Sequence, residues 1–323
     1  MGERDQKLAS IDVGTNTIRL WIGRIEPRKI VTLHTELANV RLGEGIDRDG
    51  AIDGATLSRA EGVLAGFRGV LETHSIKNAK AIGTSVFRRA GNGKRSAGVL
   101  SGKIGIEIEI ISGEEEVGLC AKGVLWEKSE LDASNLIVDV GGGSTEFIRV
   151  RGERLKAVQS LDFGAVYLTD TYLKHDPPLP EETEKIRRCI ASELSKLKNE
   201  FEYCADEGCR IIGTAGTATT LAAMDLALSE YDSGLINGHV LKLDKLKDLS
   251  RRLGALKAEE RMSIPGLDKG REDIIFAGLA AWITIMETFS QQEMTVSHYG
   301  ILEGAAIDLW ERLQVCPAGT ARI

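Results

Sequence analysis

Two short glycine-containing turns each begin with an aspartate at the end of an apolar, strand-like run. They are DVGTNT (Asp12–Thr17) and DVGGGS (Asp139–Ser144). Glycine lets other groups approach the backbone closely, and the N–H groups of such a turn, together with small hydroxyl side chains, bind phosphate oxygens. The predicted phosphate-binding residues of these turns are Thr15, Asn16, Thr17, Gly141, Gly142, Gly143 and Ser144.

The two turns are related by a constant offset. Placing Asp12 on Asp139 superposes Gly14 on Gly141, an offset of 127 residues, which indicates one supersecondary unit used in two similar domains. A third glycine turn, Gly213–Thr217, adds Gly216 and Thr217 to the predicted phosphate contacts. A single glycine-rich hairpin is usually only a hairpin, whereas the combination of three favours phosphate binding.

Carboxylates accompany the turns. A carboxylate beside a phosphate is repulsive unless a cation lies between them, so Asp139 and Glu146 are predicted to share Mg²⁺ (or Mn²⁺). Asp12 is the equivalent acid of the first half and the third predicted metal ligand; the alternative for Asp12 is a turn-capping aspartate.

Two further charged features could serve catalysis. Glu114, Glu115 and Glu116 begin a predicted helix, where acids stabilise the helix dipole, but one of them could also act as a general base on water. Residues 76–103 contain seven basic residues and no acid. This stretch is either a solvated basic face or a positive field for an anion, and Arg88, on a predicted turn, is suited to clamp a phosphate.

Bulk composition limits the class of protein. The 323 residues, 42% of them hydrophobic, are enough for two domains, and the net charge of -7 argues against nucleic-acid binding. No apolar run reaches the ~18 residues of a membrane span, and the charged N-terminus lacks a signal-peptide core. Five scattered cysteines fit reduced thiols, so we expect a cytoplasmic protein with no membrane partner.

Hydrophobic patterns alternate between strand and helix. Apolar runs predict strands at 8–13, 18–25, 30–38, 104–111, 136–140 and 147–150, and helical spacing predicts helices at 53–72, 181–203 and 273–289. This mixture indicates an α/β class with mixed sheets flanked by helices. We place the domain boundary within 126–132, giving domains 1–126 and 127–323, and the last helix, about 300–315, is free to pack back onto the first domain.

Seven segments together resemble one family, the exopolyphosphatase / guanosine pentaphosphate phosphohydrolase (Ppx/GppA) family of the actin-like ATPase superfamily. The resemblance covers nearly the whole chain. Its segments are Asp12–Leu20, Gly83–Asn92, Ile111–Leu119, Val138–Phe147, Ser160–Thr169, Gly213–Ala223 and Ile264–Gly278.

The resemblance implies two ribonuclease-H-like domains with an active site in the cleft between them. It implies that Glu116 is the catalytic glutamate that activates water, that Asp139 and Glu146 organise magnesium, and that Arg88 contacts phosphate beside the glycine turns. It also implies removal of the terminal phosphate from inorganic polyphosphate, guanosine pentaphosphate, or both.

Some positions depart from the family pattern. Tyr167 stands where members often carry Arg, and Ser297–Gly304 carries His298 and Leu302 where members tend to read S-D-x-G-L-R-E-G. These departures leave substrate preference open. The chain is the short form of the family, so a long substrate channel would need a homodimer.

Two other functions fit the same turns. One is an ATP-binding kinase or ATPase of the same superfamily, and the other is a non-catalytic sensor of polyphosphate or guanosine pentaphosphate. Retention of Glu116, Asp139 and Glu146 argues against the sensor.

Overall fold

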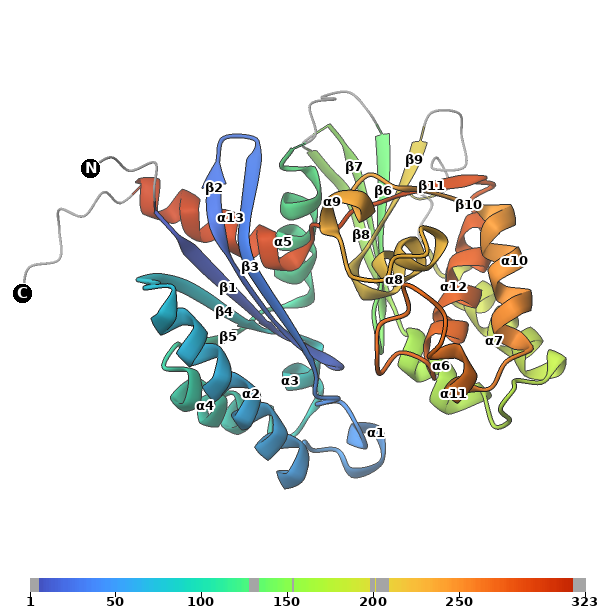
Figure 1. The fold of residues 1–323 in the computed structure, drawn as a ribbon, viewed down its shortest axis with the longest axis horizontal. Coiled ribbons are helices and arrows are strands. Elements are labelled where there is room, and N and C mark those ends of the chain that lie inside the picture. The colour runs from blue at the N-terminus through green and yellow to red at the C-terminus, as the bar shows by residue number, and fades with distance from the viewer. Residues whose placement is uncertain (1–5, 128–133, 153, 198–200, 202–208, 316–323) are drawn as a thin grey trace, which may run out of the picture. The chain divides into compact units, whose positions relative to one another are not determined.

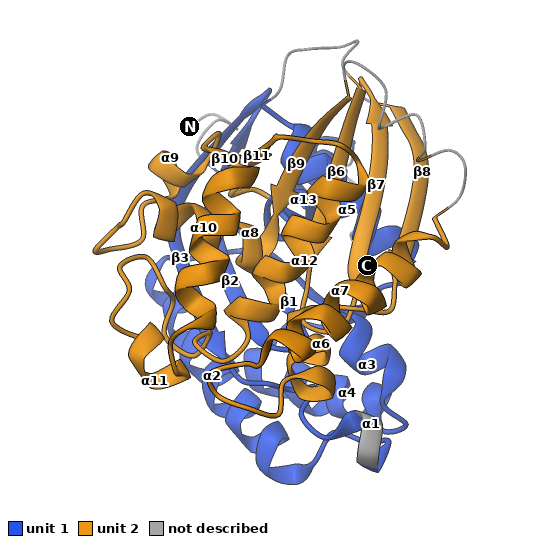
Figure 2. Ribbon diagram, turned by 90° about the vertical axis from the view of Figure 1, so that its right-hand side faces the viewer, with its two compact units in different colours: residues 1–128, 300–323 blue, residues 129–299 orange. Residues whose placement is uncertain are grey.

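The computed structural model describes residues 6–127, 134–152, 154–197, 201 and 209–315, so most of the predicted boundary at 126–132 lies outside the described residues. The chain forms two compact units, unit 1 (residues 1–128 and 300–323) and unit 2 (residues 129–299), coloured separately in Figure 2. Each unit has one mixed sheet with helices against it, which confirms the predicted α/β class.

Unit 1 is built on a five-stranded sheet. Its strands are β1 (Leu8–Val13), β2 (Thr17–Glu26), β3 (Lys29–Asn39), β4 (Asn78–Gly83) and β5 (Ile108–Ile110). Their spatial order is β3-β2-β1-β4-β5. The first three strands form an antiparallel meander, whereas β4 is parallel to β1 and β5 is parallel to β4. The carboxyl ends of β1, β4 and β5 therefore lie at one edge of the sheet.

Helices cover both faces of this sheet (Figure 1). They are α1 (Ile46–Asp49), α2 (Gly54–Thr73), α3 (Ser85–Arg89), α4 (Gly93–Ile104), α5 (Gly113–Leu125) and α13 (Ile301–Val315). Alternate β1 residues such as Ile11 join the core beneath α2 and α4. On the other face, α13 packs near α5, and the Lys80 ammonium holds Asp308 of α13 at 2.7 Å. The last helix therefore lies in unit 1.

Unit 2 begins, like unit 1, with three antiparallel strands. Its strands are β6 (Ser134–Val140), β7 (Thr145–Arg151), β8 (Arg154–Leu161), β9 (Cys209–Thr214), β10 (Val240–Lys242) and β11 (Glu293–Val296). Their order is β10-β11-β9-β6-β7-β8, with β6, β7 and β8 an antiparallel meander and β9 parallel to β6. The repeat seen in the sequence is thus a repeat of hairpins, β1–β2 and β6–β7.

The helices of unit 2 include one, α12, that is buried along most of its length. They are α6 (Ala165–Tyr172), α7 (Pro180–Leu194), α8 (Ala215–Asp225), α9 (Ser233–Ile236), α10 (Leu243–Gly254), α11 (Ala258–Arg261) and α12 (Ile275–Thr288). The helix predicted over 181–203 is present to Leu194, and most of its predicted last turns lie outside the described residues.

Two local predictions were wrong. The strand predicted over 104–111 is limited to Ile108–Ile110, because α4 continues to Ile104 and ends at Gly105, whose φ of +76° suits glycine. Arg88 was predicted on a turn and instead lies in α3. Among the helices that the structure describes, none is long and apolar enough to cross a membrane.

Candidate functional site

The first glycine turn joins β1 to β2 and directs its amides to one side. The carbonyl of Thr15 accepts the Gly43 N–H at 2.8 Å, and the carbonyl of Asn16 accepts two N–H groups of the following segment. In a trans peptide the N–H points opposite to the preceding carbonyl. The N–H groups of Asn16 and Thr17 therefore point away from those donors, as phosphate binding requires.

Arg88 connects α3 to the start of α5. Its Nη1 donates to the carbonyl of Ile111 at 2.7 Å, and its Nη2 donates to Glu116 Oε2 at 2.9 Å. Ser85, which begins α3, lies with its Oγ 3.3 Å from Thr15 Oγ1. Two predicted site residues, Arg88 and Glu116, are thus in direct contact, and α3 itself touches the first glycine turn.

The three glutamates at the start of α5 have different surroundings. Glu115 forms a capping box with Ser112, and the hydrogen bonds from the Ser112 N–H and hydroxyl lower the pKa of Glu115. Glu116 carries the ion pair to Arg88, whereas Glu114 is solvent-exposed. Helix capping therefore accounts for Glu115, and Glu116 is the one held by an arginine.

Asp12 is buried and faces Arg19 across the β1–β2 ladder. Arg19 Nη2 and Nε donate to Asp12 Oδ2 at 2.6 and 3.2 Å. Oδ1 has no hydrogen-bond partner among the described residues. Arg19 already offsets the charge of this carboxylate, which weakens the case for Asp12 as a metal ligand. Oδ1 is still able to accept a hydrogen bond.

The second glycine turn rests on the start of α6. The Gly141 carbonyl accepts the Ala165 N–H at 2.8 Å, and the Gly142 carbonyl accepts the next two N–H groups of α6 at 2.9 and 3.0 Å. By the same peptide geometry, the N–H groups of Gly142 and Gly143 point away from α6. In both halves of the repeat, the carbonyl groups of the turn accept N–H groups from another segment, and the turn amides therefore point the opposite way.

Asp139 and Glu146 are directly opposite each other on β6 and β7. Both are half-buried, and Ser160 of β8 donates to Glu146 Oε1 at 3.0 Å. Like charges at opposite positions destabilise a strand pair, so a divalent cation suits this place. Within the described ranges no three His, Cys, Asp or Glu side chains are arranged to hold a metal. Two carboxylates fit Mg²⁺, which usually keeps several waters and binds substrate phosphates.

The third glycine turn is a tight connection from β9 into α8. Ala215 has a φ of +62°, a conformation that is uncommon for a residue with a side chain. Thr217 is buried, and its hydroxyl donates to the Val140 carbonyl at 2.8 Å. That hydroxyl joins α8 to the end of β6, so a phosphate contact by Thr217 would have to come from its backbone.

Sequence reasoning missed Arg271 beside this turn. A Cβ at Gly216 would lie 2.0 Å from Arg271 Nη2, so the buried guanidinium packs on the glycine. The signal was present, because Arg271 lies within Ile264–Gly278, one of the segments that carry the family resemblance. We add Arg271 to the candidate site.

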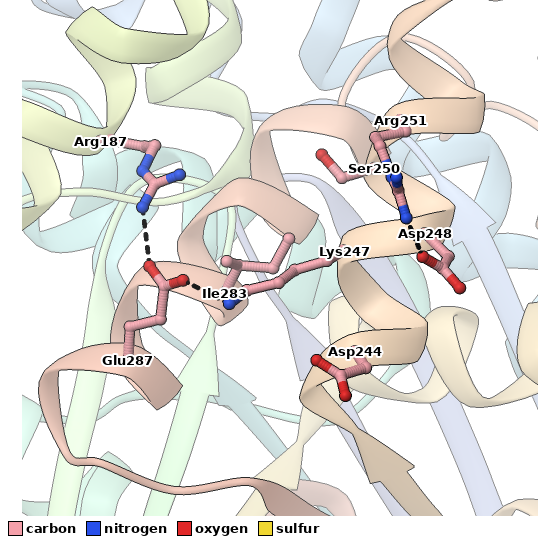
Figure 3. A pocket seen from close by; sticks show the side chains of 8 residues that line it. All are labelled: Arg187, Asp244, Lys247, Asp248, Ser250, Arg251, Ile283 and Glu287. Carbon is pink, nitrogen blue, oxygen red and sulfur yellow. Dashed lines mark hydrogen bonds and ion pairs between the residues drawn. The ribbon is translucent and has the colours of Figure 1, made fainter.

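A hollow elsewhere in unit 2 lies between α7, α10 and α12, with a volume of about 560 Å³. Figure 3 shows Glu287 between Arg187 and Lys247, which hold its carboxylate at 2.7 and 2.8 Å. It contains no predicted site residue. Apart from Asp244, its charged side chains pair with one another, Arg187 and Lys247 with Glu287 and Arg251 with Asp248. The candidate functional residues of each unit therefore remain those at its own glycine turns.

The sequence matches a known protein family over most of its length. The model of the Ppx/GppA phosphatase family matches residues 21–313. The chain belongs to this family. Membership makes it a hydrolase of phosphoanhydride bonds and confirms the resemblance read from the sequence.

Individual relatives cover the chain almost completely. Exopolyphosphatase 2 of Mycobacterium tuberculosis is 30% identical over 94% of this chain and 98% of its own length. A guanosine-5'-triphosphate,3'-diphosphate pyrophosphatase of Photobacterium profundum is 26% identical over 95% of this chain and 60% of its own length. The crystal structure of an exopolyphosphatase from Cytophaga hutchinsonii has a TM-score of 0.84 at 28% identity, covering 98% of this chain and all of the other.

Proposed function

We propose that this Ppx/GppA member removes the terminal phosphate of inorganic polyphosphate, guanosine pentaphosphate, or both. The observation that carries the proposal is the contact of Arg88 with Glu116. Arg88 lies in α3, and Ser85 of the same helix contacts Thr15 of the first glycine turn. The names of the relatives support these substrates, since they include exopolyphosphatases and a guanosine pentaphosphate pyrophosphatase.

Glu116 is assigned the role of general base. Its carboxylate takes a proton from water, the water oxygen bonds to the terminal phosphorus, and the anhydride P–O bond breaks with its electron pair on the shortened chain. Inorganic phosphate is the second product. Arg88 orients Glu116 and has further N–H donors for phosphate oxygens.

The glycine turns are assigned to position the phosphates. Their amides point away from the carbonyl contacts described above, so phosphate oxygens can take the place of water at those donors. Phosphoryl transfer leaves little covalent chemistry for the protein, and most of the acceleration comes from positioning and charge stabilisation.

Asp139 and Glu146 are the residues that would hold Mg²⁺ or Mn²⁺. When bound there, the ion supplies positive charge that offsets the negative charge of the phosphate chain. Asp12, already paired with Arg19, is a weaker third candidate. We further propose that the protein works in the cytoplasm. We also propose that it forms a homodimer, which light scattering of the purified chain tests.

One assay tests the proposal and its alternatives. Phosphate release is followed side by side with short polyphosphate, long polyphosphate, guanosine pentaphosphate and ATP, each with Mg²⁺. Release from polyphosphate or guanosine pentaphosphate is expected. Release from ATP alone would favour a superfamily ATPase, and tight binding without release would favour a sensor; either result refutes the proposal.

A further inference from the structure

Three aromatic side chains gather in unit 2 outside the set of residues assigned to phosphate. Tyr231, His298 and Tyr299 form a chain of ring contacts, which we call the aromatic cluster. The Tyr231 and His298 centroids are 5.7 Å apart with a tilt of 53°, and the His298 and Tyr299 centroids are 5.9 Å apart with a tilt of 58°. The tilted arrangement means that these rings do not stack face to face on one another.

The cluster is attached to the third glycine turn. The Ser297 N–H donates to the Gly213 carbonyl at 2.8 Å, and Thr214 Oγ1 donates to the Tyr299 carbonyl at 2.8 Å. The loop after β11 is therefore held against the residues at which β9 passes into α8. The aromatic cluster therefore lies beside the third glycine turn, where phosphate contacts are predicted.

Hydrogen bonds fix the cluster in place. The Tyr231 hydroxyl lies 2.7 Å from His298 Nδ1, and the His298 N–H donates to the Asn237 side-chain oxygen at 3.2 Å. Tyr231 is nevertheless 49% exposed. A rigid aromatic ring with an accessible surface is pre-organised for a planar ligand, because little side-chain freedom remains to be lost on binding.

The chain segment that contains Tyr231 carries negative charge. Residues 225–239 contain three acids and no Lys or Arg. Asp225 is paired with His239, and Asp232 caps α9, whereas Glu230, next to Tyr231, is exposed. A carboxylate repels polyphosphate but accepts hydrogen bonds from the N1–H and N2 amino group of guanine.

We propose that the aromatic cluster is a stacking platform for the base of a guanosine substrate, with Glu230 accepting from the guanine edge. The inference rests on the proposed function and deepens it, because it selects guanosine pentaphosphate over inorganic polyphosphate. Bases stack on Tyr and His side chains in many nucleotide-binding proteins, and the stacking is sequence-tolerant. The carboxylate would add the preference for guanine over adenine.

The test compares substrates in the full-length protein. For Tyr231→Ala, the ratio of kcat/KM for guanosine pentaphosphate to that for tripolyphosphate should fall by about 5-fold to about 100-fold, the loss of one stacked base. Tyr231→Phe, which keeps the ring, should lose far less. Glu230→Gln should reduce the preference for guanosine pentaphosphate over its adenosine analogue. Met262→Ala, an exposed apolar side chain of the same unit, is the control.

Calorimetric binding of guanosine pentaphosphate separates this inference from the proposed function. An unchanged ratio in Tyr231→Ala, or an equal fall on both substrates, overturns the platform. A wild-type protein that hydrolyses tripolyphosphate but neither binds nor hydrolyses guanosine pentaphosphate also overturns it, while the proposed function stands. If no substrate is hydrolysed but binding depends on Tyr231, the platform stands and the proposed function fails.

Discussion

The cross-strand carboxylates give a prediction that needs no turnover. Asp139 and Glu146 are directly opposite on β6 and β7. Their Cβ atoms are therefore about 5 Å apart, and two full charges at about 5 Å with an effective dielectric constant of about 20 repel by about 3 kcal/mol. Solvent screening at these half-buried positions reduces this to on the order of 1 kcal/mol.

Glu146→Gln removes that repulsion and keeps the shape, and the amide oxygen can still accept from Ser160. In the absence of divalent cations, the variant should therefore melt a few degrees above the wild type, since about 1 kcal/mol corresponds to about 2–4 °C in a domain of this size. Mg²⁺ at ten times its Kd should stabilise the wild type by about 1.4 kcal/mol, and much of this gain should be lost in the variant.

Differential scanning calorimetry with EDTA and with Mg²⁺ measures both effects. Glu293→Gln, which changes an exposed carboxylate on β11, is the control and should keep the full response to Mg²⁺. If Glu146→Gln were less stable than the wild type in EDTA and gained as much from Mg²⁺, the two carboxylates would not be the metal ligands.

Two further predictions concern α13. Burial raises the pKa of Glu303 to about 7, so the folded state loses stability as pH rises from about 4.5 through about 7. Glu303→Gln should therefore stabilise the protein by on the order of 2 kcal/mol at pH 8 and by much less at pH 4.5, as urea unfolding at the two pH values would reveal; equal effects would contradict this. Gly304→Ala would place a Cβ 1.8 Å from the Leu119 carbonyl oxygen and should cost about 1–3 kcal/mol. Gly118→Ala on α5, where the Cβ meets open space, should cost nothing in the same thermal melts, and equal melting temperatures for the two variants would refute the packing explanation.

The sequence was sufficient for features that repeat or alternate. The 127-residue offset correctly pairs two hairpins, and the observed registers place Asp12 opposite Arg19 and Asp139 opposite Glu146. Adding the same offset to Arg19 gives Glu146. The aligned repeat therefore shows that Asp12 and Asp139 have different cross-strand neighbours. Asp12 faces an arginine, whereas Asp139 faces a second acid.

Contacts between distant segments were not predictable in the same way. Thr217 donates to a carbonyl 77 residues earlier, and Arg271 packs on Gly216 from a loop that precedes α12. Neither contact can be inferred from a periodic or local pattern in the sequence. The short helix α3 was also missed, because its five residues are too few to establish a helical pattern.

The central claim is that Glu116 activates the attacking water. Its most direct test is phosphate release by Glu116→Gln, with Mg²⁺ present, from whichever substrate the wild type uses. We expect kcat to fall by ~100-fold or more, the usual contribution of a general base, while Glu114→Gln in the same helical turn keeps wild-type turnover. Full activity in Glu116→Gln would contradict the account.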